Sequence, residues 1–352
     1  MSVTFAPERT DLRPDDYRRL RRRLQRRGRL VTGALAGLAL FLFVLTLSVG
    51  SYRVPLDAVV LSVLHLGDDP GVDFVVNGLR MPTALTGLFA GIALGVAGSI
   101  FQRLLSNPLA SPDFVGVSQG ASLAAVAGLT VVDLGGIGIP VAAFVGAMVS
   151  AFLVYVLAWR DGITGYRFIL IGIGVAEFFM ACTGYLLSRS EIYEARAAMT
   201  WLMGSVGQAG TSEIRALVAV VLVAAPVAVV LHRQLRVIGL GDDAARALGA
   251  RVELARIGLL GIAIVLVAVA TAAAGPIAFV ALVSGPIAAR LLGPSSGILA
   301  AGFVGASVTL AADLVAQHLL PATLPTGVVT GAVGAPYLIW LLVTVNKRGG
   351  GG

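Results

Sequence analysis

Long apolar stretches are the feature of this sequence that most limits its fold. They recur from Val31 almost to Val345 and are separated by short polar turns. A helix needs about 20 apolar residues to cross the hydrocarbon core of a membrane, at about 1.5 Å per residue. Charged residues make up only 13% of the chain, whereas a soluble domain has about 25%. The sequence therefore predicts an all-α, polytopic membrane protein.

Turn signals such as Asn107-Pro108 and Leu324-Pro325 divide the apolar stretches into about ten predicted transmembrane helices. Their ranges are 31–50, 82–105, 113–131, 138–158, 167–188, 214–232, 255–274, 276–292, 298–319 and 327–345. The second range contains glycines at the spacing that lets membrane helices approach closely, namely Gly87, Gly91, Gly95 and Gly98. We therefore predict that these glycines serve helix packing.

The distribution of basic residues predicts the orientation. Residues 1–30 contain ten arginines and four acids, so they contribute +6 of the net charge of +7. With ten helices and a cytoplasmic N-terminus, 21 basic residues lie on the cytoplasmic side and 5 on the outer side. Cytoplasmic loops carry such an excess, and an Arg-rich segment before a helix is attracted to anionic headgroups rather than to nucleic acid. We expect both termini to be cytoplasmic.

The same reading gives the domain organisation. Residues 1–30 form a cytoplasmic Arg-rich arm, and residues 31–346 form a single transmembrane domain. The tail, residues 347–352, ends in four glycines that are typical of an added cloning sequence. We expect a multi-pass protein of the inner, cytoplasmic membrane.

Residue types that are scarce exclude several kinds of site. Lys347 is the only lysine, and a P-loop needs Gly-Lys-Ser/Thr at the start of a helix. The chain is therefore not expected to hydrolyse ATP, and ATP with Mg²⁺ would bind to a partner. Cys182 is the only cysteine, and the three histidines are far apart in the sequence. We expect no internal disulfide, no metal site and no bound cofactor.

Two carboxylates lie within predicted spans, Glu177 and Asp313. Ionisable residues in the membrane are costly and often mark a pathway, so both could serve an ion-coupled carrier. Alternatively, Asp313 forms a hydrogen bond between helices or lies near the outer end of its helix. Glu177 is in the middle of its helix and must face water or a partner, which makes it a candidate for the translocation path.

The loop between the sixth and seventh predicted helices is a candidate docking segment. Asp242 and Asp243 can begin a short helix, and Gly249 can end it. A short helix on such a loop can dock into a groove of a partner protein, or it can be an ordinary amphipathic turn at the membrane surface.

Motif residues run from the end of the second predicted helix into the third. They read Gln102, Asn107-Pro108-Leu-Ala-Ser-Pro112 and Gly116-Val-Ser-Gln-Gly120-Ala. Arg80-Met-Pro82 precedes them, and Pro325-Thr-Gly327 lies near the C-terminus. Over about residues 35–346 the chain resembles the FecCD-type permease family, which serves ABC importers of iron–siderophores, haem and cobalamin. Its C-terminal half is similar to the second permease of ferric-enterobactin-type systems.

The resemblance implies a ten-helix type II ABC importer permease that pairs with a second, homologous permease. It also implies two ATPase subunits on the cytoplasmic side and a substrate-binding protein outside. The segment that resembles the ATPase-coupling loop comprises Leu240, Gly241, Asp242, Asp243, Ala245, Leu248 and Gly249. Gln102, Asn107, Pro108, Gly120, Pro325 and Gly327 match structural positions of the family motifs.

One departure from the family concerns the outer surface. Arg80 matches an arginine that pairs with acidic residues of the binding protein, but Thr83 and Gln317 stand where many relatives carry Arg. This favours a heterodimer in which the partner permease supplies the missing charges. The expected cargo is a ferric siderophore. Haem or cobalamin is the alternative within the family, and an ion-coupled carrier using Glu177 and Asp313 is the alternative outside it.

Overall fold

The computed structural model describes residues 14–67, 69–159, 165–238, 245, 247, 249, 252–293 and 297–349. Within these ranges the chain forms helices and no strands, which confirms the predicted all-α class. The elements are α1 (Pro14–Ser48), α2 (Leu56–Val63), α3 (Pro70–Asp73), η1 (Phe74–Arg80), α4 (Met81–Leu104), η2 (Pro112–Val115), α5 (Val117–Thr130), α6 (Gly138–Ala158), α7 (Gly165–Arg189), α8 (Ile192–Leu202), η3 (Val206–Gln208), α9 (Thr211–Ile238), α11 (Val252–Ala274), α12 (Val280–Leu292), α13 (Ile298–His318) and α14 (Thr326–Gly349).

Each of the ten predicted ranges overlaps at least one helix of this set, although the bounds of several differ. In the part of the chain that the structure describes, seven helices are long and apolar enough to cross a membrane. The helices α5 and α12 have only 14 and 13 residues, and the apolar part of α14 covers Thr326–Leu341. A count of ten crossings and the orientation of the termini therefore stay predictions.

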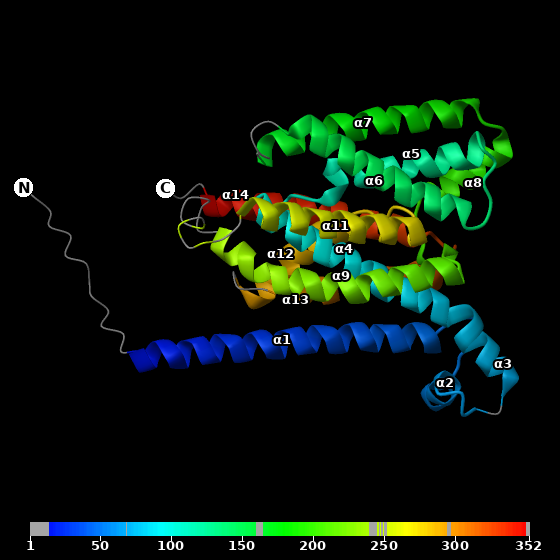
Figure 1. Cartoon of the computed structure of the whole chain (residues 1–352). Helices are drawn as coiled ribbons and strands as arrows, with labels where there is room; N and C mark the ends of the chain where they lie inside the picture. Colours follow the sequence, from blue (N-terminus) through cyan, green and yellow to red (C-terminus); the bar gives the residue numbers. More distant parts are fainter. Residues whose placement is uncertain are drawn as a thin grey trace, which may run out of the picture.

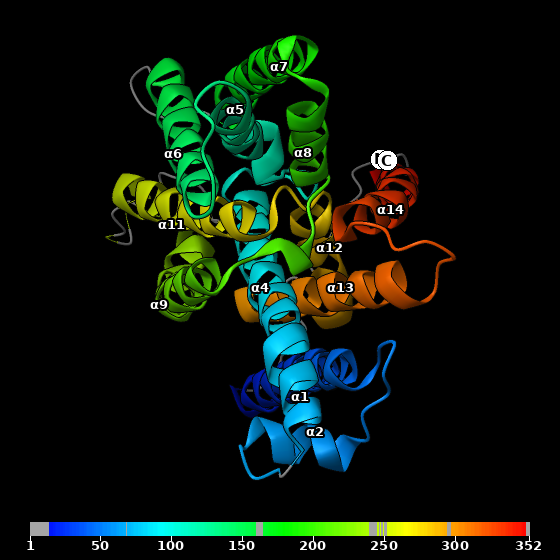
Figure 2. The same cartoon turned by 90° about the vertical axis from the view of Figure 1, so that its right-hand side faces the viewer.

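The long helices lie side by side and define two ends of the molecule (Figure 1). We call the end near both chain termini the terminal end. The other end, where α1 ends at Ser48 and α13 ends at His318, is called the far end. Seen along the bundle, α4 is central, and α9, α11, α12 and α13 surround it (Figure 2). Helices α1 and α7 lie at opposite edges, and only 17% and 22% of their candidate spans are buried.

The core depends on backbone contact at glycines, as the spacing predicts. A Cβ atom at Gly91 would lie 2.5 Å from Cα of Ala306 in α13, and one at Gly95 would lie 2.2 Å from the main-chain oxygen of Ala301. Because no side chain larger than hydrogen fits there, α4 and α13 touch along their main chains. Small residues at such spacing are typical of membrane helix pairs.

Three features of the structure differ from the sequence-based prediction. Helix α1 begins at Pro14 instead of residue 31, so the Arg-rich segment continues the first helix from Pro14 onward. The segments 50–80 and 189–213, where no helix was predicted between the spans, contain α2, α3, η1, α8 and η3. Helix α12 begins at Val280 instead of residue 276, because Gly275 and Phe279 have positive φ angles of 68° and 65° and the chain between them is not helical.

Candidate functional site

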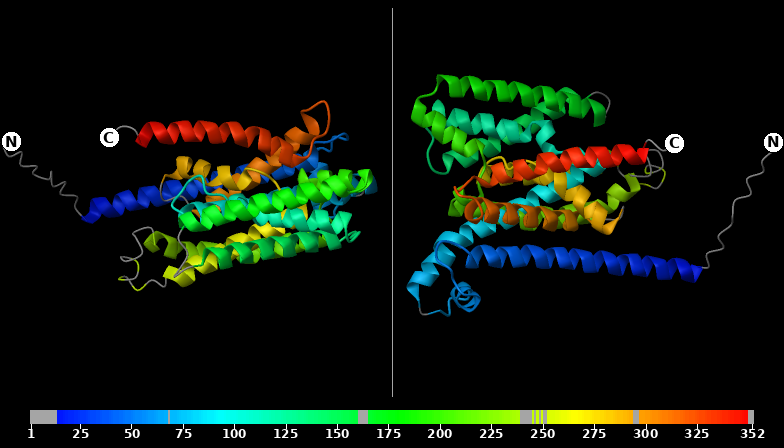
Figure 3. Two further views of the ribbon diagram at one scale, coloured as in Figure 1. Left: turned by 90° about the horizontal axis from the view of Figure 1, so that it is seen from above. Right: turned by 180° about the vertical axis from the view of Figure 1, so that it is seen from behind.

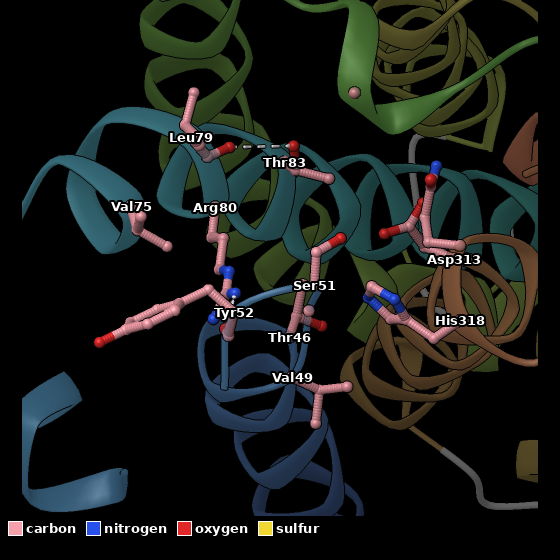
Figure 4. A pocket seen from close by; sticks show the side chains of 13 residues that line it. Thr46, Val49, Ser51, Tyr52, Val75, Leu79, Arg80, Thr83, Asp313 and His318 are labelled. Atoms are coloured by element: carbon pink, nitrogen blue, oxygen red, sulfur yellow. Dashed lines mark hydrogen bonds between the residues drawn. The ribbon is translucent and has the colours of Figure 1, made fainter. Parts of the chain in front are cut away.

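A cavity of about 460 Å³ opens at the far end of the molecule (Figure 4). Its walls come from the end of α1, the junction of η1 and α4, Gly207 and the last turn of α13. Arg80, Thr83 and Gln317 all line it. The three positions that the family resemblance relates to binding-protein docking therefore meet in one place, although Arg80 and Gln317 are far apart in the sequence. We call this the far-end cavity.

Arg80 is held in the far-end cavity by main-chain oxygens of α1. Its Nη1 donates to the carbonyl oxygens of Leu47 and Ser48 at 2.8 and 3.0 Å, and its Nη2 donates to the carbonyl oxygen of Tyr52. The last carbonyls of a helix lack partners within the helix and carry partial negative charge. Arg80 therefore caps α1 and joins it to α4. The docking role of Arg80 stays a prediction, and this capping role was not expected from the sequence.

Arg80 is the last residue of η1, a seven-residue π-helix between α3 and α4. The main-chain N–H of Met81 bonds to the oxygen of Val76, five residues earlier. Pro82 follows at the start of α4 and has no N–H to donate, so the hydrogen-bond register can change there without losing a bond. π-Helical segments are rare and often occur at functional sites.

Asp313 is the buried acid beside the far-end cavity. It is only 3% exposed, and its Oδ1 accepts a hydrogen bond of 2.9 Å from Oγ1 of Thr326 at the start of α14. The same hydroxyl accepts the N–H of Val206 at 3.4 Å. Asp313 thus forms a hydrogen bond between helices, which is one of the alternatives that the sequence predicted for it. Next to Thr326, Gly327 lies so close to the oxygen of Met203 that a Cβ would be 2.2 Å from it.

Glu177 lies elsewhere, exposed on α7. Helices α7 and α13 are separated in the bundle, so the structure does not bring Glu177 and Asp313 together (Figure 2). Apolar side chains of α7 such as Phe178 and Met180 are exposed beside it. A carboxylate on this open helix face needs water or a partner, and its role in a path stays a prediction.

The motif residues around α4 and α5 hold the main chain together. Nε2 of Gln102 donates to the oxygen of Leu282 at 2.9 Å, which ties α4 to α12. Oδ1 of Asn107 accepts the N–H of Leu109 at 2.9 Å and closes the turn that contains Pro108. A Cβ at Gly120 would lie 2.4 Å from Cβ of Ser150, so α5 and α6 are in direct contact there.

Most of the predicted ATPase-coupling loop lies outside the described residues. This applies to Leu240, Gly241, Asp242, Asp243 and Leu248. Ala245 is fully buried, and Gly249 has a φ of 79°, the left-handed conformation of a glycine that ends a helix. The end of α9 and the start of α11, which flank this loop, lie at the terminal end (Figure 1).

A second polar site was not predicted from the sequence. Asp113 accepts hydrogen bonds from Oγ of Ser118 at 2.8 Å and Oγ of Ser111 at 3.0 Å. Together with Gln119 these residues line a cavity of about 220 Å³ against the non-helical segment 276–279. The Ser-Pro-Asp string was a usable signal, because such residues commonly begin helices.

Phe279 separates this polar cavity from an apolar cavity of about 280 Å³ between α12, α13 and α14. A bulky residue at φ 65° is strained, and such strain persists only where the surroundings hold it. Its ring lies against Gly334 of α14, where a Cβ would be 2.3 Å from Cβ of Phe279. On the same helix pair, the Arg290 guanidinium stacks on the Trp340 ring with 4.0 Å to the centroid.

Known proteins show what this arrangement is similar to. The model of the FecCD transport family matches residues 38–344. The ferric enterobactin transport system permease protein FepG of Escherichia coli is 41% identical over 289 residues, covering 80% of this chain and 87% of that protein. The achromobactin transport system permease protein CbrC of Dickeya dadantii is 39% identical over 329 residues, covering 91% and 94%.

Among solved structures, one described as a metal-chelate type ABC transporter in an inward-facing conformation has the same fold. The TM-score is 0.78 at 24% identity, and the match covers 90% of this chain and 99% of that one. Seven apolar helices of sufficient length and these relatives make the chain a multi-pass protein of the inner membrane. Since the family model spans most of the chain, this protein belongs to the FecCD transport family.

Proposed function

We propose that this chain is the permease subunit of an ATP-driven importer that carries a ferric siderophore across the inner membrane. The observation that carries the proposal is the similarity to permease proteins of ferric enterobactin and achromobactin transport systems, at 41% and 39% identity over most of the chain. The family match over residues 38–344 covers all the helices that form the bundle core.

The chain acts without an enzymatic site of its own. Its one lysine, Lys347, lies near the C-terminus and outside any P-loop pattern, so ATP hydrolysis belongs to two partner ATPase subunits. These dock at the terminal end, where residues 240–249 connect α9 and α11. Closure of the ATPase pair favours one conformation of the membrane subunits, and the loop transmits that preference as a difference in contact energy.

The far-end cavity is the docking site for a substrate-binding protein. Arg80 supplies a positive charge there, while Thr83 and Gln317 are neutral. A second permease that carries arginines at the matching positions would complete the docking surface. The two permeases face each other across α7 and α14, which lie on the same side of the bundle (Figure 2). Glu177, which is exposed on α7, borders the path between them.

Cobalamin is the alternative cargo that one relative supports. The cobalamin import system permease protein BtuC of Halobacterium salinarum is 35% identical over 283 residues, covering 79% of this chain. The ion-coupled carrier has no comparable support, because Asp313 is bonded to Thr326 and lies apart from Glu177.

Co-purification tests the proposed assembly. The tagged chain is extracted from membranes in mild detergent, and every protein that elutes with it is identified. For each copy of the tagged chain we expect one copy of a second FecCD-type permease and two copies of an ATPase with a P-loop. A chain that elutes alone, under conditions in which a known importer stays intact, would refute the proposal.

A further inference from the structure

Helix α2 carries a one-sided apolar surface that no described part of the chain covers. The surface consists of Leu56, Val60, Leu61, Val63 and Leu64, which are between 37% and 59% exposed. Their spacing of i, i+4, i+5, i+7 and i+8 places them on one side of the helix, and the exposed Asp57 lies among them. We call them the α2 apolar face. Contact between such a face and water is unfavourable in free energy, so we expect lipid or another protein to cover it.

The opposite side of α2 is fixed, so the helix cannot turn to bury this face. Val59 packs in a small core with Leu47, Val54 and Val76. Oγ of Ser62 donates to Oδ1 of Asp73 at 3.0 Å. Nδ2 of Asn77 in turn donates to the main-chain oxygen of Ser62 at 2.9 Å. These contacts hold α2 against the ends of α1 and η1 with its apolar face outward.

The position of α2 indicates what covers the face. The candidate span of α1, Gln25–Ser48, has 24 residues and ends immediately before the turn that leads to α2. Because only 17% of that span is buried, side chains such as Phe41 face lipid. Oγ of Ser48 donates to the oxygen of Val54 at 2.7 Å, which pins the turn. Helix α2 then lies across the end of α1, at the level where the span ends (Figures 1 and 3).

A protein partner fits this position less well. Helix α2 protrudes at the edge of the bundle opposite α7, away from the side where α7 and α14 lie (Figure 2). It contacts α1, and most of the apolar window of α1 is exposed as well. The polar side chains around it are exposed and mixed in charge, namely Arg53, Asp57 and His65. Tyr52, also exposed, precedes the helix, and tyrosines are enriched at membrane–water interfaces.

We propose that α2 is an interfacial helix whose apolar face inserts between the acyl chains and the headgroups of the lipid leaflet at the far end. It lies parallel to the membrane plane and stabilises the far end of α1 at that depth. Apolar burial is the main source of its affinity, since basic residues do not predominate around it. The inference depends on the membrane location of the chain and is independent of its cargo.

Site-directed spin labelling tests this depth. In a Cys182→Ser background, single cysteines replace Val60 or Leu64, and the labelled full-length chain is placed in phosphatidylcholine–phosphatidylglycerol nanodiscs. Power-saturation EPR measures the accessibility of each label to oxygen, which partitions into lipid, and to a water-soluble nickel chelate. Phe41→Cys on α1 is the lipid reference. Glu191→Cys, an exposed acid before α8, is the water reference.

We expect the labels at Val60 and Leu64 to resemble the one at Phe41, with high oxygen and low nickel accessibility. Nickel accessibility at Val60 and Leu64 equal to that at Glu191 would place the face in water and overturn the proposal. Low accessibility to both reagents would show that protein covers the face, and this would also overturn it.

Discussion

The guanidinium of Arg80 donates a hydrogen bond to the main-chain oxygen of Leu47, at the last turn of α1. It also reaches the oxygen of Ser48, which accepts the Val54 N–H as well, and the oxygen of Tyr52 in the turn after α1. One side chain therefore holds the end of α1 and the turn that follows it. The first helix therefore depends on a residue of the second apolar segment for its position. A residue expected only to meet a binding protein also has a role in stability.

Arg80→Ala should lower the free energy of unfolding by about 2 kcal/mol or more, because hydrogen bonds to a charged group are lost and carbonyls are left unpaired. Arg80→Lys should restore only part of this loss, since an ammonium group cannot span three oxygens as a guanidinium does. Thermal unfolding in detergent measures both. Arg53→Ala, at an exposed arginine of the adjacent turn, is the control. Equal stability of Arg80→Ala and Arg53→Ala would show that the capping contacts contribute nothing.

Gly50→Ala should displace the Arg80 side chain without removing its charge, so it tests the two contributions separately. A Cβ at Gly50 would lie 2.3 Å from Nη2 of Arg80, so the guanidinium must move away from the α1 carbonyls while the charge remains. We expect a loss of thermal stability in the same direction as for Arg80→Ala. Gly37→Ala is the matched control, because nothing lies within 4 Å of a Cβ there. A binding-protein affinity that falls in Arg80→Ala but not in Gly50→Ala would support the docking role.

Gln102 and Gly285 should show strong coupling in a double-mutant cycle. A Cβ at Gly285 would lie 1.8 Å from Oε1 of Gln102, so Gly285→Ala forces the amide to turn and to give up its bond to Leu282. This should cost about 1–3 kcal/mol in the native background. In a Gln102→Ala background the alanine has room, and the added cost should be much smaller. Additive losses in the double variant would show that the two residues act independently.

Thr326→Val should destabilise the far end by about 1–3 kcal/mol, because it removes the donor to the buried Asp313 carboxylate and the acceptor for the Val206 N–H. Thr326→Ser keeps the hydroxyl and should remain close to the native stability. Hydrogen exchange of the amides in η3 and the first turn of α14 would locate the loss. Equal stability of the valine and serine variants would contradict the role of the hydroxyl.

The sequence predicts the long helices of this fold, because each apolar run is long enough to require either burial within the protein or contact with lipid. It does not predict α2 and α8, which are short and carry polar residues, nor the start of α1 at Pro14. Arginines favour helix without adding to an apolar run, so the polar part of α1 has no hydropathy signal. The start of α12 was misplaced because hydropathy does not report the positive φ of Phe279.

The candidate site was only partly accessible from the sequence. The resemblance related Arg80, Thr83 and Gln317 to docking, but only the packing of α4 against α13 shows that they share one cavity. Arg80 as a cap and Asp113 as a cavity residue depend on contacts between segments that no local pattern encodes. For Asp313, by contrast, the sequence pointed to the right kind of contact. A hydrogen bond between helices was one of the alternatives predicted for it, and Thr326 donates that bond.

Uptake of radiolabelled cargo tests the proposed transport most directly. Spheroplasts of a strain that lacks this gene and the ATP synthase are given the cargo with its matching binding protein, with and without the restored gene. The cargo is ferric enterobactin or ferric achromobactin labelled with radioactive iron, or cobalamin labelled with radioactive cobalt. We predict that the gene restores uptake of a ferric siderophore, and that uptake persists when a protonophore collapses the proton gradient while glycolytic ATP is maintained. Uptake that stops with the gradient, or restoration of cobalamin alone, would contradict it.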